Sequence, residues 1–159
     1  MGHLCSTFKD TIDIAKKNNS GNTAFSLAVQ DNTNVGITKH LCATFKNTID
    51  INKQGSDGRT VFMPAAKSNT NEKVIQYIYD TFKDKIDITK KDKSNQSVFM
   101  HVVSNSNELV IQYLFEMFKD TIDINQQNSD GSTILTLASR NNMNVNVLRY
   151  LCDTFKDTI

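Results

Sequence analysis

Apolar and polar residues follow one pattern that returns five times along the chain, at 4–14, 41–51, 78–88, 114–124 and 151–159. Its phenylalanines stand at 8, 45, 82, 118 and 155, and are therefore 37, 37, 36 and 37 residues apart. In the third copy and the residues just before it, Val74, Ile75, Ile78 and Phe82 recur at the spacing that places side chains on one face of a helix. Each copy therefore predicts an amphipathic helix.

A second pattern lies between these copies, at 23–28, 60–65, 97–102 and 133–138. It opens with Thr or Ser, whose hydroxyl can cap a helix by accepting from a free backbone N–H group. About two turns later comes a polar break, at Asn32, Asn69, Ser106 and Asn142. Asparagine tolerates the left-handed conformation that often ends a helix. The second pattern thus predicts a short helix ended by a left-handed residue.

Each unit therefore consists of two short helices, and such a pair cannot cover both of its own apolar faces. Neighbouring units must stack to bury the Phe, Leu and Ile positions. The predicted fold class is an all-α solenoid of stacked helix–turn–helix repeats.

The segments that join one unit to the next are too long for a tight turn, as residues 87–96 show. Gly21, Gly58 and Gly131 stand two residues before the capping Thr, and Asn95 takes the same place before Ser97. A positive φ angle is expected there, because glycine adopts it freely and asparagine tolerates it. These segments are therefore expected to project as hairpin-like loops.

Four segments carry a resemblance to the ankyrin repeat. Residues 57–66, Asp-Gly-Arg-Thr-Val-Phe-Met-Pro-Ala-Ala, resemble its D-G-x-T-P-L-H-x-A-A opening, and residues 74–78 resemble the second helix. Ile49-Asp50-Ile51-Asn52 and Ile122-Asp123-Ile124-Asn125 are similar to the segment that leads into the family's hairpin loop. The resemblance implies an ankyrin-type solenoid over essentially the whole chain.

The chain also departs from the family pattern. Its period exceeds the family's period of about 33 residues, and the single Pro64 stands inside a first helix, where it should weaken the helix. We divide the chain into one array of a partial repeat (1–17), three full repeats (18–54, 55–91 and 92–127) and a truncated last repeat (128–159). Both ends fall within a second helix, so the chain is expected either to be part of a longer array or to associate end to end.

Composition narrows the functional classes. Eighteen Lys and Arg against 17 Asp and Glu give a net charge of +1, which argues against a nucleic-acid or membrane-surface protein. No apolar run approaches the roughly 20 residues of a membrane span, and Met1-Gly2-His3-Leu4 does not resemble a signal peptide. Three cysteines without an export signal favour reduced thiols and a cytoplasmic location.

Candidate catalytic and metal-binding groups are better explained by structure. The pairs Asp10/Asp13, Asp84/Asp87 and Asp120/Asp123 recur in three of the units, whereas catalysis needs one site, so each second Asp is expected to order the turn into the loop. His3/Cys5 and His40/Cys42 stand two residues apart on a helix, where side chains diverge and cannot chelate zinc together. A Cys5–Cys42 disulfide is not expected, because stacked helices lie too far apart.

The remaining candidates are His101 and a tyrosine column. His101 stands where other units have Leu27, Pro64 and Leu137, and we expect it to be half-buried with its hydrogen bonds made, since no nucleophile accompanies it. Tyr77, Tyr113 and Tyr150 could stack on RNA bases, but the chain's charge and the helix spacing favour packing. The sequence therefore predicts no catalytic residue, no cofactor and no metal site.

Since repetition marks the scaffold, function is expected where the units differ on an exposed face. In proteins similar to this one, partners bind the concave face of loop tips and first helices. The resemblance places on that face Asn22, Gln30, Asp57, Arg59, Lys67, Lys93, Gln96, Ser104, Asn105, Asp130, Ser132 and Arg140.

Arg59, Lys67, Lys93 and Arg140 make that face mildly basic, which favours an acidic or polar segment of another protein as partner. The chain is therefore expected to be a non-catalytic protein-binding scaffold. Two alternatives stay open: the docking array of a larger enzyme or effector, and a helical-repeat RNA binder.

Overall fold

A computed structural model describes residues 11–158. This part of the chain contains eight α-helices and no β-strand, as the all-α prediction requires. The helices are α2 (Ala24–Asp31), α3 (Val35–Phe45), α4 (Phe62–Ser68), α5 (Glu72–Phe82), α6 (Val98–Val102), α7 (Glu108–Phe118), α8 (Ile134–Asn141) and α9 (Val145–Phe155). A 3₁₀ turn, η1 (Lys119–Thr121), follows α7.

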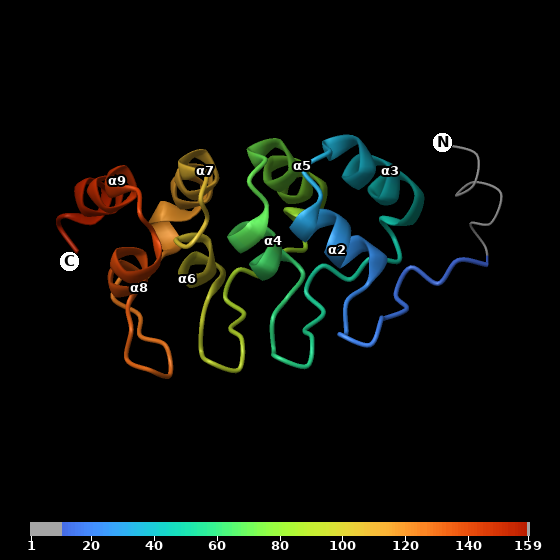
Figure 1. Cartoon of the computed structure of the whole chain (residues 1–159), viewed down its shortest axis with the longest axis horizontal. Helices are drawn as coiled ribbons and strands as arrows, with labels where there is room; N and C mark the ends of the chain where they lie inside the picture. The colour runs from blue at the N-terminus through green and yellow to red at the C-terminus, as the bar shows by residue number, and fades with distance from the viewer. Residues whose placement is uncertain (1–10, 159) are drawn as a thin grey trace.

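The helices form two layers (Figure 1). The first helices of the repeats, α2, α4, α6 and α8, contact one another in sequence, and the second helices α3, α5, α7 and α9 do the same. Four loops project side by side from the first-helix layer (Figure 1). We call them finger 1 (residues 13–22), finger 2 (50–59), finger 3 (87–96) and finger 4 (123–132). The predicted solenoid of stacked helix pairs is confirmed.

The first helices begin as predicted in three of the four repeats. A side-chain oxygen caps the N–H of the residue three positions on, in the pairs Thr23 with Ser26, Ser97 with Met100 and Thr133 with Thr136. Thr60 makes no such cap, and α4 begins only at Phe62. The reason is Pro64, which lacks the N–H group that its counterpart Leu137 donates to the carbonyl of Thr133.

The first helices do not end in left-handed residues. Asn32, Asn69 and Asn142 all have extended backbone angles, with φ of −103°, −77° and −109°, so this prediction was wrong. The break of the third repeat was also misplaced: Asn105, not Ser106, takes the role of Asn69. One residue fewer separates Asp92 from Asn105 than separates Gly55 from Asn69. The 36-residue repeat is therefore shorter in its first helix.

Asn69, Asn105 and Asn142 instead join successive repeats. The Nδ2 group of Asn69 donates to the carbonyls of Val29 (2.9 Å) and Asn32 (3.0 Å), and its Oδ1 accepts from the N–H of Asn71. Asn105 and Asn142 repeat this arrangement, each bonding to two carbonyls of the repeat before it. Each such amide satisfies backbone groups at a helix end that would otherwise lack partners.

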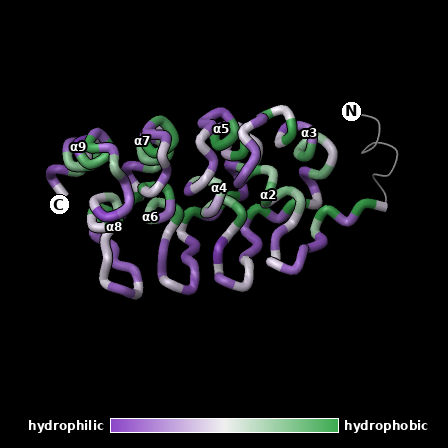
Figure 2. The backbone as a smooth tube through the Cα atoms, viewed as in Figure 1, coloured by the Kyte–Doolittle hydropathy of each residue, from purple (hydrophilic) through white to green (hydrophobic). Residues whose placement is uncertain are grey.

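Apolar residues are concentrated in the helices and at the base of the fingers, whereas the projecting parts of the fingers are mostly hydrophilic (Figure 2). Phe45, Phe82 and Phe155 are at most 6% exposed, and Phe118 packs against the core while partly exposed. Rings of successive repeats meet edge to face, with centroids 6.1 Å apart for Phe25 and Phe82. Phe8 lies outside the described residues. Stacking of repeats therefore buries the phenylalanine column, as predicted.

Candidate partner-binding face

Each finger ends in a tight turn that is built in the same way. Gly21, Gly58 and Gly131 have φ angles of 82°, 80° and 75°, and Asn95 has a φ of 60°, as predicted from their residue types. A side-chain oxygen at the start of the turn accepts from two backbone N–H groups in three fingers, where the residue is Asn18, Asp92 or Asn128. The tips are therefore ordered by their own hydrogen bonds.

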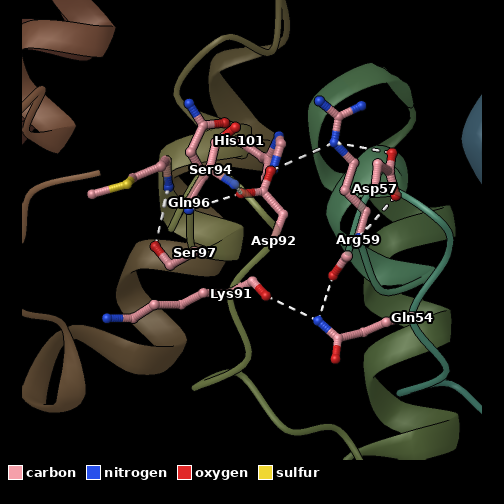
Figure 3. Close-up of polar contacts among 11 residues, drawn as sticks. Gln54, Asp57, Arg59, Lys91, Asp92, Ser94, Gln96, Ser97 and His101 are labelled. Atoms are coloured by element: carbon pink, nitrogen blue, oxygen red, sulfur yellow. Dashed lines mark hydrogen bonds and ion pairs between the residues drawn. The ribbon is translucent and has the colours of Figure 1, made fainter. Parts of the chain in front are cut away.

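Backbone hydrogen bonds connect fingers 2, 3 and 4. The N–H of Lys93 donates to the carbonyl of Asp57 (3.0 Å), and the N–H of Ser129 donates to the carbonyl of Ser94 (2.9 Å). The side chain of Gln54 also donates to the carbonyl of Lys91 (2.9 Å; Figure 3). These three fingers thus form one connected surface.

A buried polar cluster lies where fingers 2 and 3 meet α6 (Figure 3). The Nε2 of His101 lies 3.0 Å from Oδ2 of Asp92, and both side chains are almost fully buried. The Nε of Arg59 lies 3.6 Å from the same oxygen and 3.6 Å from Oδ2 of Asp57. We predicted His101 to be half-buried; it is only 3% exposed, because fingers 2 and 3 close over it.

The environment favours a neutral His101 beside an ionised Asp92. Burial lowers the pKa of His101, and the charges of Arg59 and Lys67 add to this, whereas the hydrogen bond that His101 donates to Asp92 raises the pKa. Burial acts to raise the pKa of Asp92, but hydrogen bonds from Gln96, His101 and Ser94 outweigh it and lower the pKa. A carboxylate can only accept, so Nε2 of the neutral imidazole carries the proton.

The predicted face residues lie at finger tips and along the first helices. Exposed or half-exposed are Asn22, Gln30, Asp57, Arg59, Lys67, Lys93, Gln96, Ser104, Asp130, Ser132 and Arg140. Asn105 is only 1% exposed, because its side chain holds the turn against the preceding repeat. Its assignment to the face was therefore wrong, and it follows from the misplaced break of the third repeat.

The paired carboxylates and the tyrosine column, which were the other candidate groups, have structural roles. Oδ1 of Asp87 accepts from both the hydroxyl and the N–H of Thr89, and these bonds lower the pKa of Asp87. This is the turn-ordering role that we predicted for such residues. Tyr77, Tyr113 and Tyr150 pack partly buried against the core.

The cysteine–histidine pairs are only partly visible in the structure. His3 and Cys5 lie outside the described residues. Cys42 is buried as a free thiol, and burial raises its pKa to about 11. A thiol with so high a pKa is protonated at neutral pH and is therefore a poor nucleophile.

Comparison with protein families agrees with this architecture. Residues 81–158 match the family model for ankyrin repeats in three copies, and the same helix pair and finger recur from residue 13 onwards. The chain is an ankyrin-repeat protein. A search of curated proteins gave no match. Ankyrin repeats are in general protein–protein interaction modules and are typically non-catalytic. No helix among residues 11–158 of this ankyrin array has the length and apolarity to cross a membrane.

Proposed function

We propose that this ankyrin array is a non-catalytic scaffold that binds a partner protein through its finger tips and first helices. The proposal rests mainly on how charged side chains are used on this face. Lys67, Lys93 and Arg140 are exposed, and among the described residues no carboxylate pairs with them. Charges that do no structural work are available to a partner.

Arg59 belongs to a different class from these three side chains. Its guanidinium group lies beside the buried carboxylate of Asp92, so it stabilises the contact between fingers 2 and 3. Replacing it would disturb the scaffold as well as the face, because one partner of a buried charge would be lost. A test of the face should therefore leave Arg59 unchanged.

The partner that this face fits is an acidic or polar segment of another protein. Three unpaired cations spread over three repeats favour carboxylates on the partner. The basic charge is too weak for the phosphate contacts that dominate nucleic-acid binding, since the whole chain carries only +1. The rigid connection of fingers 2 to 4 reduces the entropy that binding would cost.

The test is capture of proteins by three immobilised chains, followed by mass spectrometry. One is the wild type, one carries Lys67→Glu, Lys93→Glu and Arg140→Glu, and the control carries Lys73→Glu, Lys83→Glu and Lys156→Glu on the exposed second-helix layer. We expect a partner that is lost only by the first variant, at least about tenfold in amount. Identical captured sets, or capture that nuclease treatment abolishes, would contradict the proposal.

A further inference from the structure

Finger 1 stands apart from finger 2, unlike every later pair of neighbouring fingers. No hydrogen bond joins residues 13–22 to residues 50–59, both of which lie within the described part of the chain. The bond that corresponds to Lys93 N–H with Asp57 would link the N–H of Ser56 to the carbonyl of Ser20. Neither of these two groups has a hydrogen-bond partner, from backbone or side chain, among residues 11–158.

Finger 1 also lacks two side chains by which finger 2 bonds to the next repeat. Asn52 of finger 2 donates to the carbonyl of Lys85 and accepts from the N–H of Asp87, and Gln54 donates to Lys91. Finger 1 has Ala15 and Lys17 at the two corresponding positions. Alanine cannot form such a bond, and a lysine is more stable with its charge in water.

The space around the finger-tip glycines also shows that finger 1 lies farther from finger 2 than finger 2 does from finger 3. A Cβ atom added to Gly58 would lie 2.7 Å from the backbone nitrogen of Lys93, so finger 2 touches finger 3 directly. A Cβ atom added to Gly21, at the same place on finger 1, would meet nothing within 4 Å. There is thus open space beside finger 1 where the next finger pair is in contact.

A groove of about 480 Å³ occupies this space. Its walls are fingers 1 and 2, and its floor includes Phe25, Val61 and Pro64 from the first-helix layer. Ser20 and Ser56, with their unpaired backbone groups, both line it. The volume is in the range of pockets that hold a small ligand or a few residues of a peptide.

Some of the charged side chains that line the groove have partners within the chain, and others do not. The carboxylate of Asp57 lies beside Arg59, and Asp50 accepts from the N–H of Asn52. Lys17 on finger 1 and Lys53 on finger 2 are both exposed, and neither forms an ion pair within the described residues. Asp50 has no ion-pair partner within residues 11–158 either, so the unpaired side chains of the groove are two lysines and one carboxylate, and their net charge is positive.

We propose that this groove binds an extended acidic segment of a partner protein, a proposal that rests on the scaffold function above. The segment's carboxylates pair with Lys17 and Lys53. Its backbone takes the place of a neighbouring finger, by accepting from the N–H of Ser56 and donating to the carbonyl of Ser20. An extended peptide suits these groups, because it presents donors and acceptors along its edge.

The test is selection from a library of random peptides, with the full chain as the immobilised target. Each peptide has roughly 12 residues, an extended length of about 40 Å. Selected peptides are labelled with fluorescein and titrated. We expect them to be rich in Asp and Glu, and to bind a Lys17→Glu/Lys53→Glu variant at least about tenfold more weakly. The matched control, Lys73→Glu/Lys83→Glu, carries the same charge change on the exposed second-helix layer, outside the groove, and should bind within about twofold of the wild type. The proposal that the groove binds an acidic segment would be overturned if no peptide or only basic peptides were selected. Equal binding of the peptides by both variants would also overturn it.

Amide hydrogen exchange provides a second readout of the same complex. The N–H of Ser56 should exchange quickly in the free chain and slowly with peptide bound, whereas the bonded N–H of Lys93 should exchange slowly in both. If the exchange rate of the Ser56 N–H were the same with and without peptide, the proposed binding in the groove would be overturned. If a captured protein depends on Lys67, Lys93 and Arg140 while no acidic peptide binds, the scaffold function stands and the groove alone fails.

Discussion

At the scale of single residues, His101 shows how one substitution alters a repeated unit. The corresponding residue in the last repeat is Leu137, which is buried in the core. His101 is equally buried, but it is held by Asp92, which Arg59 approaches from finger 2. An apolar contact of the last repeat has become a polar contact between two repeats. The hydrogen bond compensates for the cost of burying the imidazole.

This arrangement predicts a pH dependence of stability. Because the pKa of His101 is lowered in the folded chain, the unfolded chain binds its proton first as the pH falls. Stability should therefore decrease from the ordinary histidine pKa of about 6.5 downwards to the lower pKa of the folded state. Asp92 adds a further loss only at more acidic pH, since its pKa lies below the ordinary carboxylate value.

The measurement is denaturant unfolding at about pH 7 and about pH 5. The wild type should lose stability between these values, and His101→Leu should lose clearly less, although it is less stable at neutral pH. An equal loss in both proteins would show that His101 does not cause the pH dependence.

At the scale of elements, the backbone conformation of the finger tips could be predicted from the sequence, whereas the way in which the first helices end could not. The positive φ angles of the finger tips followed from glycine and asparagine at fixed positions. The ends of the first helices were misjudged, because asparagine serves equally well as a left-handed residue or as a side chain that bonds to backbone. Only contacts with the preceding repeat decide between these roles. The recurring Asn-x-Asn at 32–34, 69–71, 105–107 and 142–144 was the signal that could have indicated them.

The two finger-tip glycines of repeats 1 and 2 allow a matched experiment. Both have φ near +80°, so alanine should cost about 1–2 kcal/mol of unfolding free energy at either position. Only at Gly58 would the new methyl group also collide with Lys93, which should raise the cost to about 2–5 kcal/mol. Denaturant unfolding of Gly21→Ala and Gly58→Ala measures the difference. Equal losses would mean that fingers 2 and 3 do not touch.

At the scale of the whole molecule, stacking was predictable because the apolar positions recur with the period of the repeat. A helix pair with two apolar faces has no other way to bury Phe82. The groove beside finger 1 could not be predicted, because it depends on the absence of bonds between two loops. Even so, Ala15 and Lys17 differ from Asn52 and Gln54 in the sequence itself.

The account depends on neighbouring repeats hiding their phenylalanines against one another, and Phe82→Ala tests this directly. Phe82 is 1% exposed and meets Phe25 of the preceding repeat edge to face. Denaturant unfolding should show a loss of about 3–5 kcal/mol, while Met143→Ala at a fully exposed position should show almost none. A loss below about 1 kcal/mol for Phe82→Ala would place that ring in solvent and contradict the stacked array.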